Sequence, residues 1–152
     1  MKRITVFLLS AVLILSACGA SEGIEVSDAW ARTATQGTNG AIYFVIQNHN
    51  ADADELIGAA SSLADAVEVH ESKMDGDVMM MQQMDSVALA PSAKVEFMPG
   101  GLHVMLIGLK QDINAGDEVE LTLLFANSPD LTVKAIVKDA DGMDTPDMDH
   151  SE

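Results

Sequence analysis

Residues 40–47 read GAIYFVIQ, and the next seven residues, 48–54, read NHNADAD. The first stretch is rich in β-branched and aromatic side chains, which favour strands, and the second is a cluster of turn-forming residues. Short apolar segments separated by turns recur at residues 24–32, 55–60, 66–71, 94–98, 102–109, 118–125 and 131–138. This spacing predicts an all-β sandwich or barrel.

Two further segments fit more than one type of secondary structure. Residues 78–84 could form a strand or a helix by composition, and the only sign of helical periodicity lies around residues 58–66. Neither segment alters the expectation of one sheet-rich domain over residues 24–138.

The composition limits the class of protein. The chain has 152 residues, which suits a single domain with its own core. It carries 24 Asp and Glu against 8 Lys and Arg, and this acidity argues against nucleic acid as a partner. Ten residues are Met, and seven of these lie between Met74 and Met105. The single Cys excludes an internal disulfide framework and any CxxC metal or redox site.

The N-terminus has the pattern of a signal peptide. Residues 1–18 read MKRITVFLLSAVLILSAC, with two basic residues followed by an apolar run that is too short to span a membrane. The last four of these residues resemble a bacterial lipobox, in which the Cys is lipidated; the alternative is an ordinary signal peptide with an incidental Cys. We therefore expect a periplasmic, membrane-anchored lipoprotein that is lipidated at Cys18 and has a tether at residues 19–23.

Two His and two Met form a candidate set of metal ligands. His103 and Met105 are two residues apart in an expected strand, so both side chains lie on one face. His70 ends another alternating segment, and Met79 and Met81 share a face if residues 78–84 are extended. Together, His70, Met81, His103 and Met105 would provide two imidazole nitrogens and two thioether sulfurs.

This donor set suits Cu(I). Soft Cu(I) favours sulfur and accepts imidazole, whereas Ca²⁺ and Mg²⁺ prefer oxygen, and structural Zn²⁺ usually takes Cys or His. In an oxidising compartment, Met also supplies soft sulfur without forming disulfides.

The spacing of these residues resembles the signature of the periplasmic copper chaperones of the PCu(A)C family. In that signature, a His is followed by ten residues and a Met, and then by twenty-one residues and a His-x-Met. His70, Met81, His103 and Met105 match all four positions, and segments such as DAWAR at 28–32 and PGGLHVML at 99–106 are also similar. The resemblance covers residues 24–138.

The resemblance implies a cupredoxin-like Greek-key fold in which these four residues bind Cu(I) near one surface. It also implies that the protein passes copper to partners, notably during assembly of the cytochrome c oxidase copper centre. Those partners would be the oxidase copper subunit or its assembly factors. Met74, Met79 and Met84 are candidate auxiliary ligands, and Met79, Met80 or Met84 could each take the place of Met81 as a ligand.

The acidic C-terminus allows two interpretations. Residues 139–152 carry six acidic residues and no basic ones, which is typical of a disordered tail. Met143, Met148 and His150 could instead form a second copper site, in which His and carboxylates suit Cu(II) and Met suits Cu(I).

Other functions fit the sequence less well. They either give no role to the spacing of the His and Met residues or need a residue or motif that the chain lacks. A blue-copper electron carrier needs a Cys ligand, and Cys18 lies outside the domain. The chain has no P-loop, GxSxG or HExxH motif, so we expect no enzyme. Copper storage or resistance, and a β-sandwich for adhesion or assembly that binds no metal, remain the alternatives.

Overall fold

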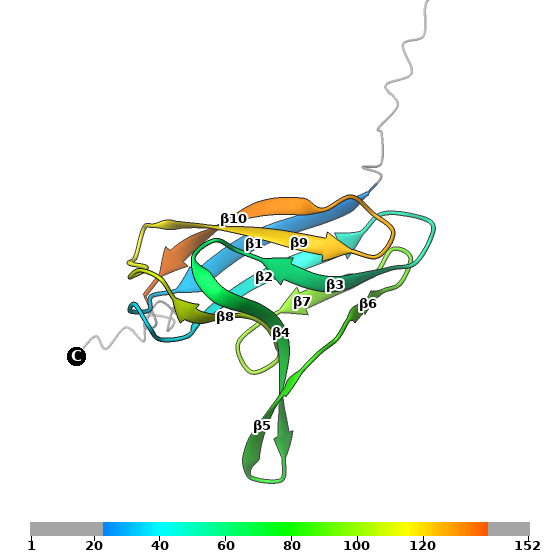
Figure 1. Ribbon diagram of the computed structural model, residues 1–152. Helices are drawn as coiled ribbons and strands as arrows, with labels where there is room; N and C mark the ends of the chain where they lie inside the picture. Colours follow the sequence, from blue (N-terminus) through cyan, green and yellow to red (C-terminus); the bar gives the residue numbers. More distant parts are fainter. Residues whose placement is uncertain (1–22, 140–152) are drawn as a thin grey trace, which may run out of the picture.

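The computed structural model describes residues 23–139, which form ten β-strands and no helix (Figure 1). The strands are β1 (Ile24–Arg32), β2 (Gly40–Asn48), β3 (Asp54–Ala60), β4 (Ala64–Asp75), β5 (Val78–Gln83), β6 (Val87–Leu89), β7 (Lys94–Phe97), β8 (Leu102–Leu109), β9 (Glu118–Phe125) and β10 (Leu131–Lys138). The expected all-β class is confirmed. Within these residues there is accordingly no helix long and apolar enough to cross a membrane.

The strands belong to one continuous sheet that folds over itself (Figure 1). Their order is β5-β4-β8-β7-β2-β1-β10-β9-β3-β6, and β8 also pairs with β2. The β1–β10 and β7–β8 pairs are parallel, and the other pairs are antiparallel. Strands from both ends of the sequence therefore meet in the middle of the sheet.

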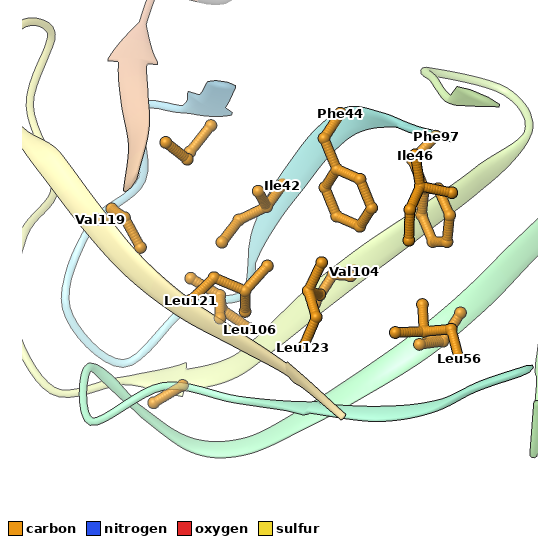
Figure 2. Close-up of a cluster of buried hydrophobic side chains, with 14 of the residues drawn as sticks. Ile42, Phe44, Ile46, Leu56, Phe97, Val104, Leu106, Val119, Leu121 and Leu123 are labelled. Carbon is orange, nitrogen blue, oxygen red and sulfur yellow. The ribbon is translucent and has the colours of Figure 1, made fainter. Parts of the chain in front are cut away.

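The core fills the inside of the folded sheet (Figure 2). On β2, the inward positions carry Ile42, Phe44 and Ile46, and the Phe44 ring stacks on Phe97 with centroids 4.3 Å apart. On β9, every second residue from Val119 to Phe125 is buried. Each large apolar side chain removed from water contributes about 1.5–3 kcal/mol, so this alternation is what holds the sheet closed.

The structure corrects the expectation of helical character around residues 58–66. Residues up to Ala60 belong to β3, and β4 begins at Ala64, which is buried opposite Leu109. The Ala-rich sequence favours a helix locally, but pairing on both sides places the chain in the sheet. Residues 78–84, which allowed either structure, are a strand up to Gln83. The three-residue strand β6 is too short to show an alternating pattern.

Strand β4 is longer than the expected 66–71 segment and forms a projecting hairpin with β5. The two strands extend together beyond the rest of the domain (Figure 1). They are joined by the two-residue turn Gly76–Asp77, in which Gly76 has a φ of +62°. A positive φ at the first central position of a hairpin turn is readily adopted by Gly. This hairpin brings the Met-rich segment alongside β4.

Candidate metal centre

The four candidate ligands lie on three neighbouring strands, β5, β4 and β8. His70 is on β4, Met81 is on β5, and His103 and Met105 are on β8. The residues alternating with them, such as Val69 and Val104, are in the core. Because successive strand residues point to opposite faces, the candidate ligands share the outer face of this part of the sheet.

His103 on β8 is directly opposite His70 on the adjacent strand β4, and the two ring centroids are 6.0 Å apart. The His103 side chain is almost completely buried, with a relative exposure of 5%. Its Nδ1 lies 3.1 Å from the carbonyl oxygen of Gly101. A carbonyl can only accept a hydrogen bond, so Nδ1 carries the proton and donates it. In the neutral ring, Nε2 therefore keeps its lone pair.

His70 has the opposite arrangement. Its Nε2 lies 2.8 Å from Oε2 of Glu68, two residues earlier on the same face of β4. Its Nδ1 is buried and has no hydrogen-bond partner among residues 23–139. A buried polar atom without a partner costs about 1–3 kcal/mol. With Nε2 donating to Glu68, the neutral His70 ring keeps a lone pair on this unpartnered Nδ1.

The two thioethers reach the same region from either side of the His pair. Met105 lies opposite Glu68 on β4 and opposite Ala41 on β2, and its sulfur is 4.0 Å from Nδ2 of Asn39. Met81 is opposite Ser72 and is 51% exposed. One shallow surface pocket is lined by Met81, His103 and Met105, together with Met79 and Ser72. His70 is not among the residues that line this pocket, but it lies beside the pocket as the cross-strand neighbour of His103.

Two small residues separate the hairpin from His103. Ser72 on β4 donates its backbone N–H to the carbonyl of Gly101, at 3.0 Å, so these residues are neighbours across the β4–β8 pair. Both residues border the route from Met81 to His103, and neither has a side chain large enough to block it. A flexible Met side chain can therefore lie over them towards the buried imidazole.

The other Met residues named from the sequence lie in different environments. Met79 lines the pocket, and Met74 lies directly opposite Met79; this pair is nearer the tip of the hairpin than Met81 is. Met84 packs against the core from the opposite face. Met80 is opposite Lys73, also on the opposite face from Met81. The candidate residues Cys18, Met143, Met148 and His150 lie outside the described residues.

Three residues near the pocket were not predicted from the sequence to have a role in the site. Glu68 could have been found, because it is two residues from His70 and a strand places both on one face. Arg32 and Tyr43 also line the pocket, with the Arg32 guanidinium 5.7 Å from the Tyr43 ring centroid. The Tyr43 ring is 6.4 Å from that of His103. These two come from β1 and β2, so no spacing in the sequence marks them.

A comparison with protein families decides the classification. The family model described as "Putative lipoprotein LpqE-like" matches residues 24–137, almost the whole of the described domain. The chain belongs to the LpqE-like family. A curated relative, "Putative lipoprotein Lxx21020" of Leifsonia xyli subsp. xyli, is 32% identical over 123 residues, which cover 80% of this chain and 74% of the relative.

Solved structures relate this LpqE-like domain to PCuAC domains. The copper-bound PCuAC domain from PmoF2 is 27% identical, with a TM-score of 0.65 over 76% of this chain and 92% of that domain. The solution structure of Cu(I)-bound DR1885 from Deinococcus radiodurans is 28% identical, with a TM-score of 0.55 over 81% of this chain and 83% of that protein. The expected membership of the PCu(A)C family and the cupredoxin-like fold are both confirmed.

Proposed function

We propose that this LpqE-like protein is an extracytoplasmic copper chaperone that binds Cu(I) through His70, Met81, His103 and Met105. The observation that carries the proposal is the pair of imidazole lone pairs, on His103 Nε2 and His70 Nδ1, beside thioethers on one face of the sheet. Metal-ligating His side chains typically donate their other N–H to a carbonyl or carboxylate, as both of these do. The copper-bound relatives support copper as the metal.

The burial of the ligands suggests how copper is handed over. Met81 is half exposed and comes from the projecting hairpin, whereas His103 is buried. A partner that offers a soft ligand can therefore approach copper from the Met81 side, and His103 is the ligand that it reaches least easily. Stepwise exchange keeps copper bound throughout, and Cu(I) changes neither its charge nor its oxidation state.

The cellular setting of the proposal follows from the N-terminal sequence. Lipidation at Cys18 would anchor the domain outside the cytoplasm, in the periplasm, and the family description and the Leifsonia relative both carry the word lipoprotein. The formal net charge of −16 would attract cations and basic partner surfaces. We infer that the recipients are the copper subunit of cytochrome c oxidase or its assembly factors.

A transfer experiment tests delivery. The Cu(I)-loaded protein is mixed without oxygen with the soluble copper domain of the oxidase or with an assembly factor. The proteins are then separated, and the copper in each is measured. We expect copper to move to the acceptor. Copper that stays on the donor would contradict delivery and favour storage. A wild-type protein that binds no Cu(I) in competition with bicinchoninate would contradict the chaperone proposal itself.

Removing the carboxylate behind His70 should weaken copper binding. We expect Glu68→Ala to lower the Cu(I) affinity about tenfold, because Nε2–H loses the acceptor that orients the ring. Glu68→Gln keeps an oxygen acceptor and should stay close to wild type. The measurement is anaerobic competition with bicinchoninate.

The matched control for this experiment is Glu71→Ala. Glu71 is on the same strand but on the opposite face, where its carboxylate pairs with Lys73 at 2.7 Å. Both variants remove one negative charge. An equal loss of affinity in both would show that Glu68 acts only through overall charge and does not position His70.

A further inference from the structure

The β4–β5 hairpin exposes more thioether than packing of the domain requires. Met74 is 63% exposed, Met79 is 61% exposed and Met80 is 54% exposed, and all lie near the turn between β4 and β5. These two strands form the hairpin that projects from the domain (Figure 1). Single exposed apolar side chains are ordinary, but several in one short hairpin call for an explanation.

The strand register determines which of these side chains are neighbours. Met74 lies directly opposite Met79, and Ser72 lies opposite Met81. The backbone N–H of Met84 donates to the carbonyl of Val69, at 2.8 Å, so the pair formed by these two residues is hydrogen-bonded. Because hydrogen-bonded and non-hydrogen-bonded pairs alternate, Met74–Met79 is a non-hydrogen-bonded pair.

Side chains in non-hydrogen-bonded pairs are close together. Their Cα atoms are about 4.5 Å apart, nearer than in the hydrogen-bonded pairs. Met81 follows Met79 by two residues and therefore lies on the same face. This face of the hairpin thus carries three adjacent thioethers, from Met74, Met79 and Met81. Met80 points to the other face, where it lies opposite Lys73.

We propose that Met74, Met79 and Met81 form a second, weaker Cu(I) site on the hairpin. Cu(I) favours soft sulfur donors, and thioethers bind it without losing a proton. The carboxylates of Asp75 and Asp77, at and beside the turn, add negative potential for an incoming cation. The site lies outside the His70–His103 centre but shares Met81 with it.

The shared ligand gives the hairpin a role in copper exchange, and this role rests on the proposed function. While Met81 stays bound, the bonds from copper to the His nitrogens and Met105 can break as bonds to Met74 and Met79 form. No electron or proton is transferred in this step. The hairpin site would then be where copper enters the domain and where it is offered to a partner.

Methyl NMR resolves the two sites. The full chain, labelled with ¹³C in the Met methyl groups, is titrated with Cu(I) without oxygen up to two equivalents. We expect the first equivalent to shift the Met81 and Met105 methyl signals. The second should shift those of Met74 and Met79 and move the Met81 signal again, because Met81 is shared between the two sites, with Met80 unchanged. Binding in the C-terminal tail would appear separately, on Met143 and Met148. Unmoved Met74 and Met79 signals would overturn the proposal.

Paired variants supply the control. Met74→Leu with Met79→Leu keeps apolar side chains of similar volume and should abolish this second binding event and slow release of copper to bicinchoninate. Met80→Leu changes the same type of side chain on the other face and should have neither effect. Equal effects in both variants would contradict the assigned ligands.

A further variant separates this proposal from the chaperone proposal. With His70→Ala and His103→Ala, the principal site is lost, but the Met74 and Met79 signals should still respond to Cu(I). If only the hairpin responds in the wild type, the principal site is wrong and the hairpin site stands. If only Met81 and Met105 respond, the hairpin site is wrong and the principal site stands.

Discussion

Replacing His103 by alanine is expected to lower the Cu(I) affinity by more than about 100-fold, since even residues that only orient metal ligands are commonly worth 10–100-fold. His103 is the most buried of the four proposed ligands, and its Nε2 lone pair is oriented by the bond from Nδ1 to Gly101. Among residues 23–139, neither of the other two imidazoles can replace it, because His70 already contributes Nδ1 and His49 is bonded to Glu25. Anaerobic competition with bicinchoninate measures the loss.

Two further variants make the His103 result interpretable. His49→Ala removes an imidazole that is bonded to Glu25 at 2.9 Å, away from the site, and should leave the affinity unchanged. Met105→Leu preserves apolar volume and should weaken binding in a folded protein even if His103→Ala proves unstable. Wild-type affinity in both His103→Ala and Met105→Leu would refute the proposed centre.

The second large effect concerns stability and involves Asp54 at the start of β3. This carboxylate is only 4% exposed and accepts backbone hydrogen bonds from Glu55 at 2.8 Å, Asn127 at 2.9 Å and Ser128 at 2.9 Å. It therefore joins β3 to the loop that follows β9. Asp54→Asn should lower the free energy of unfolding by about 2–3 kcal/mol at neutral pH, because hydrogen bonds to a charged acceptor are the stronger ones.

The pH dependence of this effect has a definite sign. Burial acts to raise the pKa of Asp54, but hydrogen bonds from Ser128, Glu55 and Asn127 outweigh burial and lower the pKa below its ordinary value of 3.8. A lowered carboxyl pKa in the folded state adds stability that is fully present above the unfolded pKa. This stability is lost as the pH falls through the folded pKa, so the wild type and Asp54→Asn should converge in strong acid.

Urea unfolding at neutral pH and at a pH well below 3.8 measures both quantities. Asp130→Asn is the matched control, because it makes the same charge change at an exposed position in the loop after β9. We expect it to have little effect at either pH. A difference between wild type and Asp54→Asn that persists undiminished in strong acid would contradict the assigned role of the charge.

The sequence predicted the site best where a short spacing within one strand determines which side chains share a face. Strand alternation predicted that His103 and Met105 share a face, and the structure places both beside one pocket. The same rule could have identified Glu68 behind His70. The sequence was misleading around residues 58–66. The local helix propensity there is outweighed by the pairing of β3 and β4 with their neighbouring strands.

Residue periodicity alone could establish which side chains point the same way along each strand, because the alternation of a strand is a local property of the backbone. It could not establish which strands are neighbours or in what register. The hydrogen bonds between β4 and β8 place His70 opposite His103, although 32 residues separate them in the chain. The pairing of β4 with β5 likewise turns Met84 towards the core and sets Met74 against Met79. Sheet register depends on burying the whole inner face at once, so these contacts arise only when the entire domain closes.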